Sequence, residues 1–154
     1  MINESDSERD ERYMGIALEE ARLAAEEGEV PVGAVVVCGG RVIARAHNQT
    51  ERLGDATAHA EMLALTAAQN HLGGKALPEA TLYITLEPCP MCAGAIGWVR
   101  PGRIVWGADD PKRGFSTICR QGCSPLQPKS IVTRGVRAEE CAEIMASFFR
   151  KLRR

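Results

Sequence analysis

Residues 81–92 read TLYITLEPCPMC, and the architecture of this 154-residue chain can be worked out from them. The apolar run over 81–86 predicts a buried strand. Pro88, Cys89 and Cys92 follow at once, and the i, i+3 spacing of the two cysteines places both thiols on one face of a helix. Proline is suited to a first helical turn, where its missing N–H costs nothing. This stretch therefore predicts a strand that leads directly into a helix start carrying two thiols.

Strands and helices alternate on both sides of this stretch. Helices at about 58–70 and 89–99, with strands at 81–86 and 103–107, form the βαβ pattern that favours parallel pairing. Upstream, 32–37 and 41–46 predict an antiparallel hairpin through the tight turn 38–40. A helix over 12–27, a strand near 130–134 and a helix at about 138–152 complete the chain. We expect an α/β fold, a three-layer αβα arrangement with a mixed five-stranded sheet.

Composition indicates one ordinary globular domain. The chain is 45% hydrophobic and 25% charged, and no apolar run approaches the ~20 residues that span a bilayer. Residues 1–11 predict a flexible acidic N-terminal tail, and 12–154 a single domain. The polar N-terminus does not resemble a secretory signal, so we expect a cytoplasmic protein without a membrane partner.

A second motif, TAHAE at 57–61, supplies His59 and Glu61. One imidazole and two thiolates, from His59, Cys89 and Cys92, fill three positions around Zn²⁺ and leave the fourth open for water, as in catalytic sites. Glu61 is then placed to move protons. Residues i and i+2 lie about 200° apart on a helix, so we expect His59 and Glu61 at a helix start, with the site between two N-termini.

Each motif also has a simpler interpretation. C-x-x-C alone fits a redox pair or half of a structural zinc site, and H-x-E alone is nearly uninformative. A redox role would leave His59 and Glu61 without a task. H-x-E followed about thirty residues later by P-C-x-x-C matches the pattern of zinc nucleobase deaminases.

Six segments extend this match over nearly the whole chain: EVPVGAV at 29–35, HN at 47–48, TAHAE at 57–61, TLEPCPMCAGA at 85–95, GADDPKRG at 107–114 and FFR at 148–150. They resemble the bacterial tRNA-specific adenosine deaminases, which belong to the cytidine deaminase-like zinc deaminases. That family converts the wobble adenosine of an anticodon to inosine. The resemblance implies the family's fold, one Zn²⁺ per subunit on His59, Cys89 and Cys92, and Glu61 as the proton shuttle.

The resemblance also implies substrate contacts. Asn48 would contact the base beside an apolar wall at Val30, since an asparagine amide offers a donor and an acceptor to an adenine edge. The alternative is a loop residue that caps its own backbone. Asp110 and Lys112 would contact RNA sugar and phosphate; the alternative is a solvated turn.

Further implied features concern the partners, a tRNA anticodon arm and a second copy of the chain. Phe148 and Phe149 could stack on exposed bases, and because adjacent residues lie about 100° apart on a helix, we expect one in the core and one exposed. For Ile96 and Trp98, the sequence allows either a core position or a position in a subunit interface.

A deaminase of a free base or nucleoside, such as guanine, is the nearest alternative. The motif CPMCAGAIGW resembles guanine deaminases too, and zinc chemistry does not separate these substrates. The formal charge of −1 and the pI near 6.3 are unusual for a nucleic-acid binder. Without the first twelve residues, however, the chain has 17 basic and 15 acidic residues. Asn48, the D-x-K pattern and the Phe-Phe-Arg helix favour RNA.

Overall fold

A mixed five-stranded sheet lies at the centre of the computed structural model, which describes residues 3–119 and 122–153. The strands are β1 (Gly33–Cys38), β2 (Arg41–His47), β3 (Ala80–Leu86), β4 (Arg103–Ala108) and β5 (Ile131–Arg134), in the order β2-β1-β3-β4-β5. β1 pairs antiparallel with β2 and β3, whereas β3, β4 and β5 are parallel. The predicted α/β class and mixed sheet are therefore confirmed. Residues 120, 121 and 154 of the predicted domain, and 1 and 2 of the predicted tail, lie outside the described residues.

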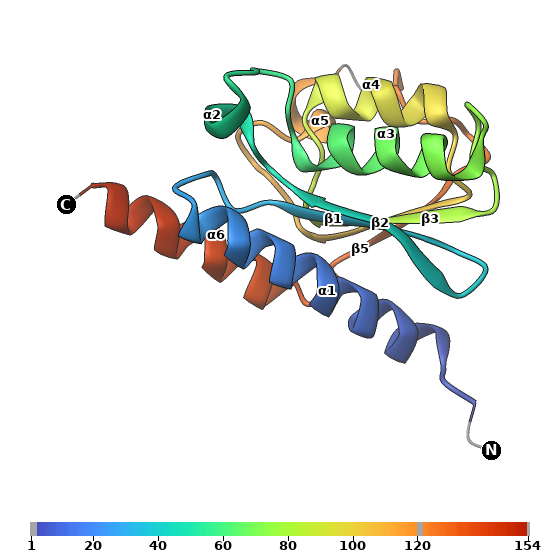
Figure 1. The fold of residues 1–154 in the computed structure, drawn as a ribbon, viewed down its shortest axis with the longest axis horizontal. Coiled ribbons are helices and arrows are strands. Elements are labelled where there is room, and N and C mark those ends of the chain that lie inside the picture. Colours follow the sequence, from blue (N-terminus) through green and yellow to red (C-terminus); the bar gives the residue numbers. More distant parts are fainter. Residues whose placement is uncertain (1–2, 120–121, 154) are drawn as a thin grey trace.

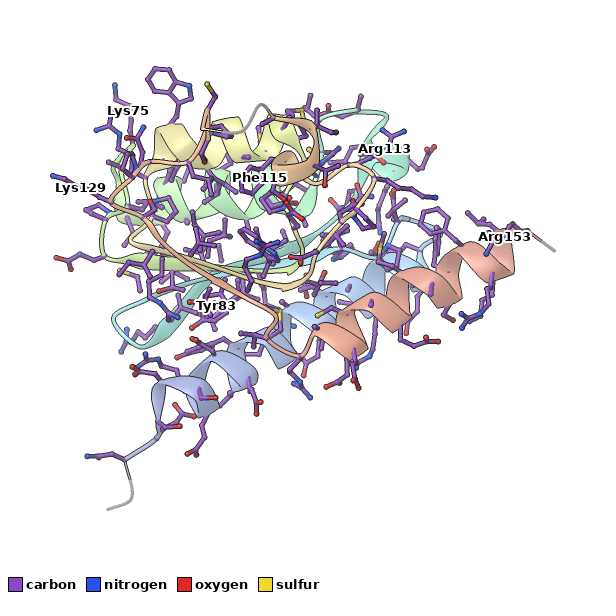
Figure 2. All side chains as sticks on the ribbon, turned by 180° about the vertical axis from the view of Figure 1, so that it is seen from behind. Lys75, Tyr83, Arg113, Phe115, Lys129 and Arg153 are labelled. Carbon is purple, nitrogen blue, oxygen red and sulfur yellow. The ribbon has the colours of Figure 1, made fainter. Side chains whose placement is uncertain are left out.

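Helices cover both faces of the sheet, as the three-layer prediction requires (Figure 1). α1 (Asp6–Glu26) and α6 (Ala138–Leu152) lie on one face, and α3 (Ala60–Leu72) and α4 (Pro90–Val99) on the other. Alternate side chains of each strand point to opposite faces. Tyr83 accordingly packs with α1 and α6, whereas Leu82 and Ile84 pack with α3 and α4. Figure 2 shows Tyr83 beneath the sheet and Phe115 above it.

The β1–β2 hairpin turns through Gly39 and Gly40, as predicted. Their φ angles of 60° and 72° lie in the left-handed region, which glycine adopts without steric cost. The pairing contains an irregularity between Val36 and Val37.

α1 begins six residues earlier than the sequence indicated. Ser5 caps it by accepting a hydrogen bond from the Glu8 N–H at 3.1 Å. Asp10, only 5% exposed, accepts hydrogen bonds from the Tyr83 hydroxyl at 2.6 Å and from both terminal nitrogens of Arg103 at 3.0 and 2.8 Å. The prediction of a flexible tail is therefore wrong for residues 6–11. Asp10, one of the five acidic residues of the predicted tail, is buried, and its hydrogen-bond partners lie far away in sequence.

Two short helices were also missed, α2 (Thr50–Leu53) and α5 (Phe115–Ile118). α5 lies between β4 and β5, where the sequence analysis predicted no helix. Ile96 is buried and Trp98 is 80% exposed, so only Ile96 belongs to the core.

The carboxyl ends of β3 and β4 lie at one end of the sheet, beside the N-termini of α3 and α4 (Figure 1). We call this the site end, because ligands of open α/β sheets bind there. α4 begins at Pro90, which takes the first helical position that the sequence analysis gave to Pro88. Among the described residues, no helix is both long and apolar enough to cross a membrane.

Candidate active site

Three predicted ligands meet at the site end. His59 is the N-cap residue of α3, Cys89 is the N-cap residue of α4, and Cys92 lies in the first turn of α4. His59 Nδ1 lies 3.7 Å from Cys89 Sγ and 3.4 Å from Cys92 Sγ, and the three ligand atoms lie within 4.8 Å of one another. Zn–S and Zn–N bonds of ordinary length at tetrahedral angles place N and S roughly 3.6 Å apart. The group therefore fits a zinc ion.

The two thiols at the start of α4 differ: the hydrogen bond with Cys89 and burial raise the pKa of Cys92, whereas Cys89 is favoured as a thiolate. The positive end of the helix dipole and unpaired N–H groups favour a thiolate. Hydrogen bonds from Cys92 and with His59 lower the pKa of Cys89 to about 4, although its partial burial opposes this. A thiolate at neutral pH is the form that binds a metal.

Glu61 lies in the first turn of α3, two residues after His59, and is 4% exposed. Burial raises its pKa to about 7, while its own backbone N–H and the nearby His59 act in the opposite direction. A carboxyl group with a pKa near the working pH can both accept and return a proton. The helix start thus places a buried carboxyl group beside the three potential ligands.

Asn48 and Val30 also lie together. The Asn48 Nδ2 donates to the Val30 carbonyl at 3.3 Å, and its Oδ1 accepts from the Thr50 N–H at 3.1 Å. The side chain therefore does cap its own loop, yet one N–H and one lone pair of its amide remain for a further partner. The Gln49 N–H donates to the Ala58 carbonyl at 3.0 Å, which ties this segment to the residue before His59.

Glu29, which the sequence analysis did not single out, fixes the start of α2, close to Asn48 in the chain. Its carboxylate is 1% exposed and accepts from the N–H groups of Glu51 at 3.0 Å and Arg52 at 2.8 Å. It thereby caps α2 from outside the helix. The only sequence signal is an acid directly before the apolar run 30–37.

Residues 87–89 join β3 to α4, and we call them the cysteine loop because they include Cys89. Asp110 and Lys112 lie in a turn beside this loop. Asp110 Oδ1 accepts from the N–H groups of Lys112 and Arg113, both at 3.1 Å, so the alternative of a turn describes its local role. The Asp110 N–H donates to Glu87 Oε1 at 3.0 Å. Glu87, 3% exposed, was also missed, although it stands directly before Pro88 in the motif.

The two phenylalanines contact each other on α6. Their rings are 5.3 Å apart in an edge-to-face arrangement. Phe149 is 41% exposed, as expected for one of the two, but Phe148 is only half-buried and belongs to neither core cluster, so the expectation of a core phenylalanine is wrong. The last turn of α6 lies at the site end (Figure 1). Figure 2 shows Arg113 and Arg153 at the same end, and Lys75 and Lys129 at the opposite end.

A carboxyl group beside a His-Cys-Cys group is also the arrangement that zinc deaminases use. The chain matches the MafB19-like deaminase family over residues 8–153, which defines the protein as a deaminase. The tRNA-specific adenosine deaminase of Bacillus subtilis (strain 168) is 47% identical over 148 residues, covering 95% of this chain and 92% of that protein. The chain therefore belongs to the tRNA-specific adenosine deaminase family.

Solved structures agree with this assignment. A tRNA:A34 deaminase, studied for A-to-I editing at the wobble position of transfer RNA, superposes with a TM-score of 0.79 at 47% identity, covering 86% of this chain and 98% of that one. A guanine deaminase of Bacillus subtilis is less similar, with a TM-score of 0.62 and 34% identity, covering 75% of this chain and 71% of that one.

Proposed function

We propose that this chain hydrolyses the wobble adenosine of a tRNA anticodon to inosine, releasing ammonia, with one zinc ion per subunit held by His59, Cys89 and Cys92. The observation that carries the proposal is the buried Glu61 beside these three residues, in a chain 47% identical to a tRNA-specific adenosine deaminase. Bound zinc would supply Lewis-acid activation of the attacking water.

Glu61 performs the proton transfers in this proposal. Its carboxylate accepts a proton from water as the oxygen attacks C6 of the adenine, and delivers that proton to ring N1. The second proton of the same water, now on the C6 hydroxyl, passes through Glu61 to the exocyclic nitrogen, which leaves as ammonia as the C6–N bond breaks and the C6 carbonyl forms. Burial favours the neutral form of Glu61 and raises its pKa to about 7, so the proton it has accepted is readily held and then returned.

The remaining predicted residues would bind the nucleotide. Asn48 offers its free N–H and lone pair to the base edge, and Val30 forms the adjoining apolar wall. Asp110 and Lys112 would contact sugar and phosphate, and Phe149 would stack on an unpaired base. A tRNA substrate also fits the expected cytoplasmic location.

A homodimer completes the proposal. Trp98 on α4 is 80% exposed, and Met91 on the same helix is 38% exposed. Large exposed apolar side chains favour an interface. Sedimentation at micromolar concentration tests this part, and a stable monomer would contradict it.

The activity test uses an anticodon stem-loop with adenosine at the wobble position, with free guanine, adenosine and cytidine in parallel. Inosine in the stem-loop and ammonia from no free compound is the expected result. Ammonia from guanine, with the RNA unchanged, would replace the proposal with a free-base deaminase. Glu61→Ala serves as the control for contaminating activity.

A further inference from the structure

Glu87 belongs to the cysteine loop, and its side chain faces the turn that carries Asp110. Its Oε1 accepts from the Asp110 N–H at 3.0 Å, and its Oε2 accepts from the Ser116 N–H at 3.1 Å and from the Ser116 hydroxyl. A carboxylate has only acceptor sites, so it suits a position faced by three donors. One buried side chain therefore holds both ends of the segment 110–116.

Gly114 makes the fit tight. A Cβ on Gly114 would lie 2.5 Å from the Glu87 carboxyl carbon and 2.6 Å from the Asp110 carbonyl oxygen. Contacts this short do not occur, so a larger residue would force the segment away from Glu87.

The same segment is bonded to the cysteine loop through the backbone. The Phe115 N–H donates to the Pro88 carbonyl at 2.9 Å, and the Glu87 N–H donates to the Ala108 carbonyl at 2.8 Å. Cys89 follows Pro88 directly. If segment 110–116 moved, its position relative to Cys89, a potential metal ligand, would therefore change.

Packing fixes the segment chiefly through Phe115, which is buried and meets the Trp106 ring edge-to-face with the ring centroids 5.7 Å apart. Phe115 and Ser116 border a cavity of about 490 Å³, whose other walls include Trp106, Leu126 and Val132. Residues 111–113 and Ser116 are exposed, so the hydrogen bonds to Glu87 fix the ends of the segment, which packing does not hold.

We propose that Glu87 is a positioning residue for the substrate. It touches neither the metal position nor the RNA, and acts by fixing segment 110–116, with the backbone of Asp110 and Lys112, at a set place beside Cys89. The inference rests on the proposed function for the identity of the substrate. Its geometric part, that Glu87 holds the segment, does not depend on that substrate.

The first experiment measures whether Glu87 holds the segment. Glutamine has the size of glutamate but only one acceptor oxygen, so Glu87→Gln can serve one side of the segment while its NH₂ group faces a donor on the other. Amide hydrogen exchange should become at least about tenfold faster at whichever of Asp110 and Ser116 faces the NH₂ group of the variant. Zinc content should stay at that of the parent. Unchanged exchange at both amides would overturn the proposal.

The second experiment measures the consequence for catalysis. With the stem-loop as substrate, Glu87→Gln should raise KM about tenfold and change kcat less than about threefold, as expected when binding contacts alone are displaced. Gly114→Ala should show the same split, because it pushes on the same contact without altering charge. It also keeps the test available if Glu87→Gln folds poorly.

Asp10→Asn is the matched control. Asp10 is as buried as Glu87 and also accepts three hydrogen bonds, but from side chains away from the site. It should lose stability while keeping the KM and kcat of the parent. An equal KM rise in Asp10→Asn would show a general loss of rigidity and overturn the positioning role. A parallel fall of zinc content and kcat in Glu87→Gln would also overturn it.

If the parent acts on guanine and leaves the stem-loop unmodified, the proposed function fails, and the RNA part of this inference fails with it. The hydrogen-exchange result still decides whether Glu87 holds the segment.

Discussion

Buried carboxylates lie towards both ends of the sheet, but they bind different kinds of partner. Asp10, near the start of β4, binds the side chains of Tyr83 and Arg103, which belong to strands. At the site end, Glu29 and Glu87 bind the backbone N–H groups of short helices and turns. A carboxylate that joins strands to a helix adds stability to elements already formed. One that binds loop backbone determines where irregular chain lies, and irregular chain carries most functional contacts.

Removing a metal ligand should have the largest effect and only at the site end. Cys89→Ala should bind less than about 0.1 zinc per chain and show no detectable deamination, because two ligands hold zinc poorly. Zinc content by atomic emission checks this. Cys38→Ala, a half-buried thiol on β1 outside the His-Cys-Cys group, is the control and should keep zinc and activity. Normal zinc content in Cys89→Ala would show that the ligand set is wrong.

Removing the acid–base group should separate catalysis from metal binding. Glu61→Gln should lower kcat by about 10³-fold, within the range of general acid–base catalysis, while zinc content and fold stay those of the parent. Single-turnover kinetics with the stem-loop, beside far-UV circular dichroism, measures both. Activity within tenfold of the parent would remove Glu61 from the mechanism.

The site end was largely predictable because its chemistry is local in sequence. His59 and Glu61 are two residues apart, Cys89 and Cys92 three apart, and each pair adjoins a helix start. The sheet followed from apolar runs and from the Gly39-Gly40 turn. Spacing and periodicity therefore determine both the potential ligand group and the strands that present it.

The buried carboxylates were not predictable because their partners are distant. Asp10 pairs with residues 73 and 93 positions away, so it counted as one more acid in a polar tail. Glu29 and Glu87 accept from N–H groups 22 to 29 positions away. Short helices such as α2 and α5 have little periodicity of their own, and tertiary contacts decide them.

Removing the Asp10 carboxylate should affect stability alone. Asp10→Asn should lower the free energy of unfolding by about 2 kcal/mol, because it breaks a largely buried ion pair. For a chain of this size that corresponds to a fall in Tm of roughly 4–8 °C. Calorimetry measures it. A change in KM for the stem-loop would break the contrast between the two ends.

The same variant should alter acid unfolding. Burial raises the pKa of Asp10, but hydrogen bonds from Arg103 and Tyr83 and the charge of Arg103 outweigh it and leave the pKa lowered. A lowered pKa in the folded state contributes stability fully above the unfolded value of about 3.9 and loses it as the pH falls further. The stability difference between parent and Asp10→Asn should therefore shrink below about pH 4. A difference that stays constant down to pH 2 would contradict the role of the Asp10 charge.

Phe149 should give the smallest effect and sharpen the comparison within a single helix. Its exposed ring contributes little to the core, so Phe149→Ala should leave Tm within about 1 °C and raise KM for the stem-loop about fivefold, the low end of the range for one stacked base. Phe148→Ala should instead lower Tm, because that side chain is half-buried. Ile131→Ala, an exposed apolar residue at the start of β5 and away from the site end, is the control and should change neither quantity. If Phe149→Ala and Ile131→Ala give the same KM, the last turn of α6 does not contact the RNA, and the substrate surface is limited to the loops that Glu29 and Glu87 hold.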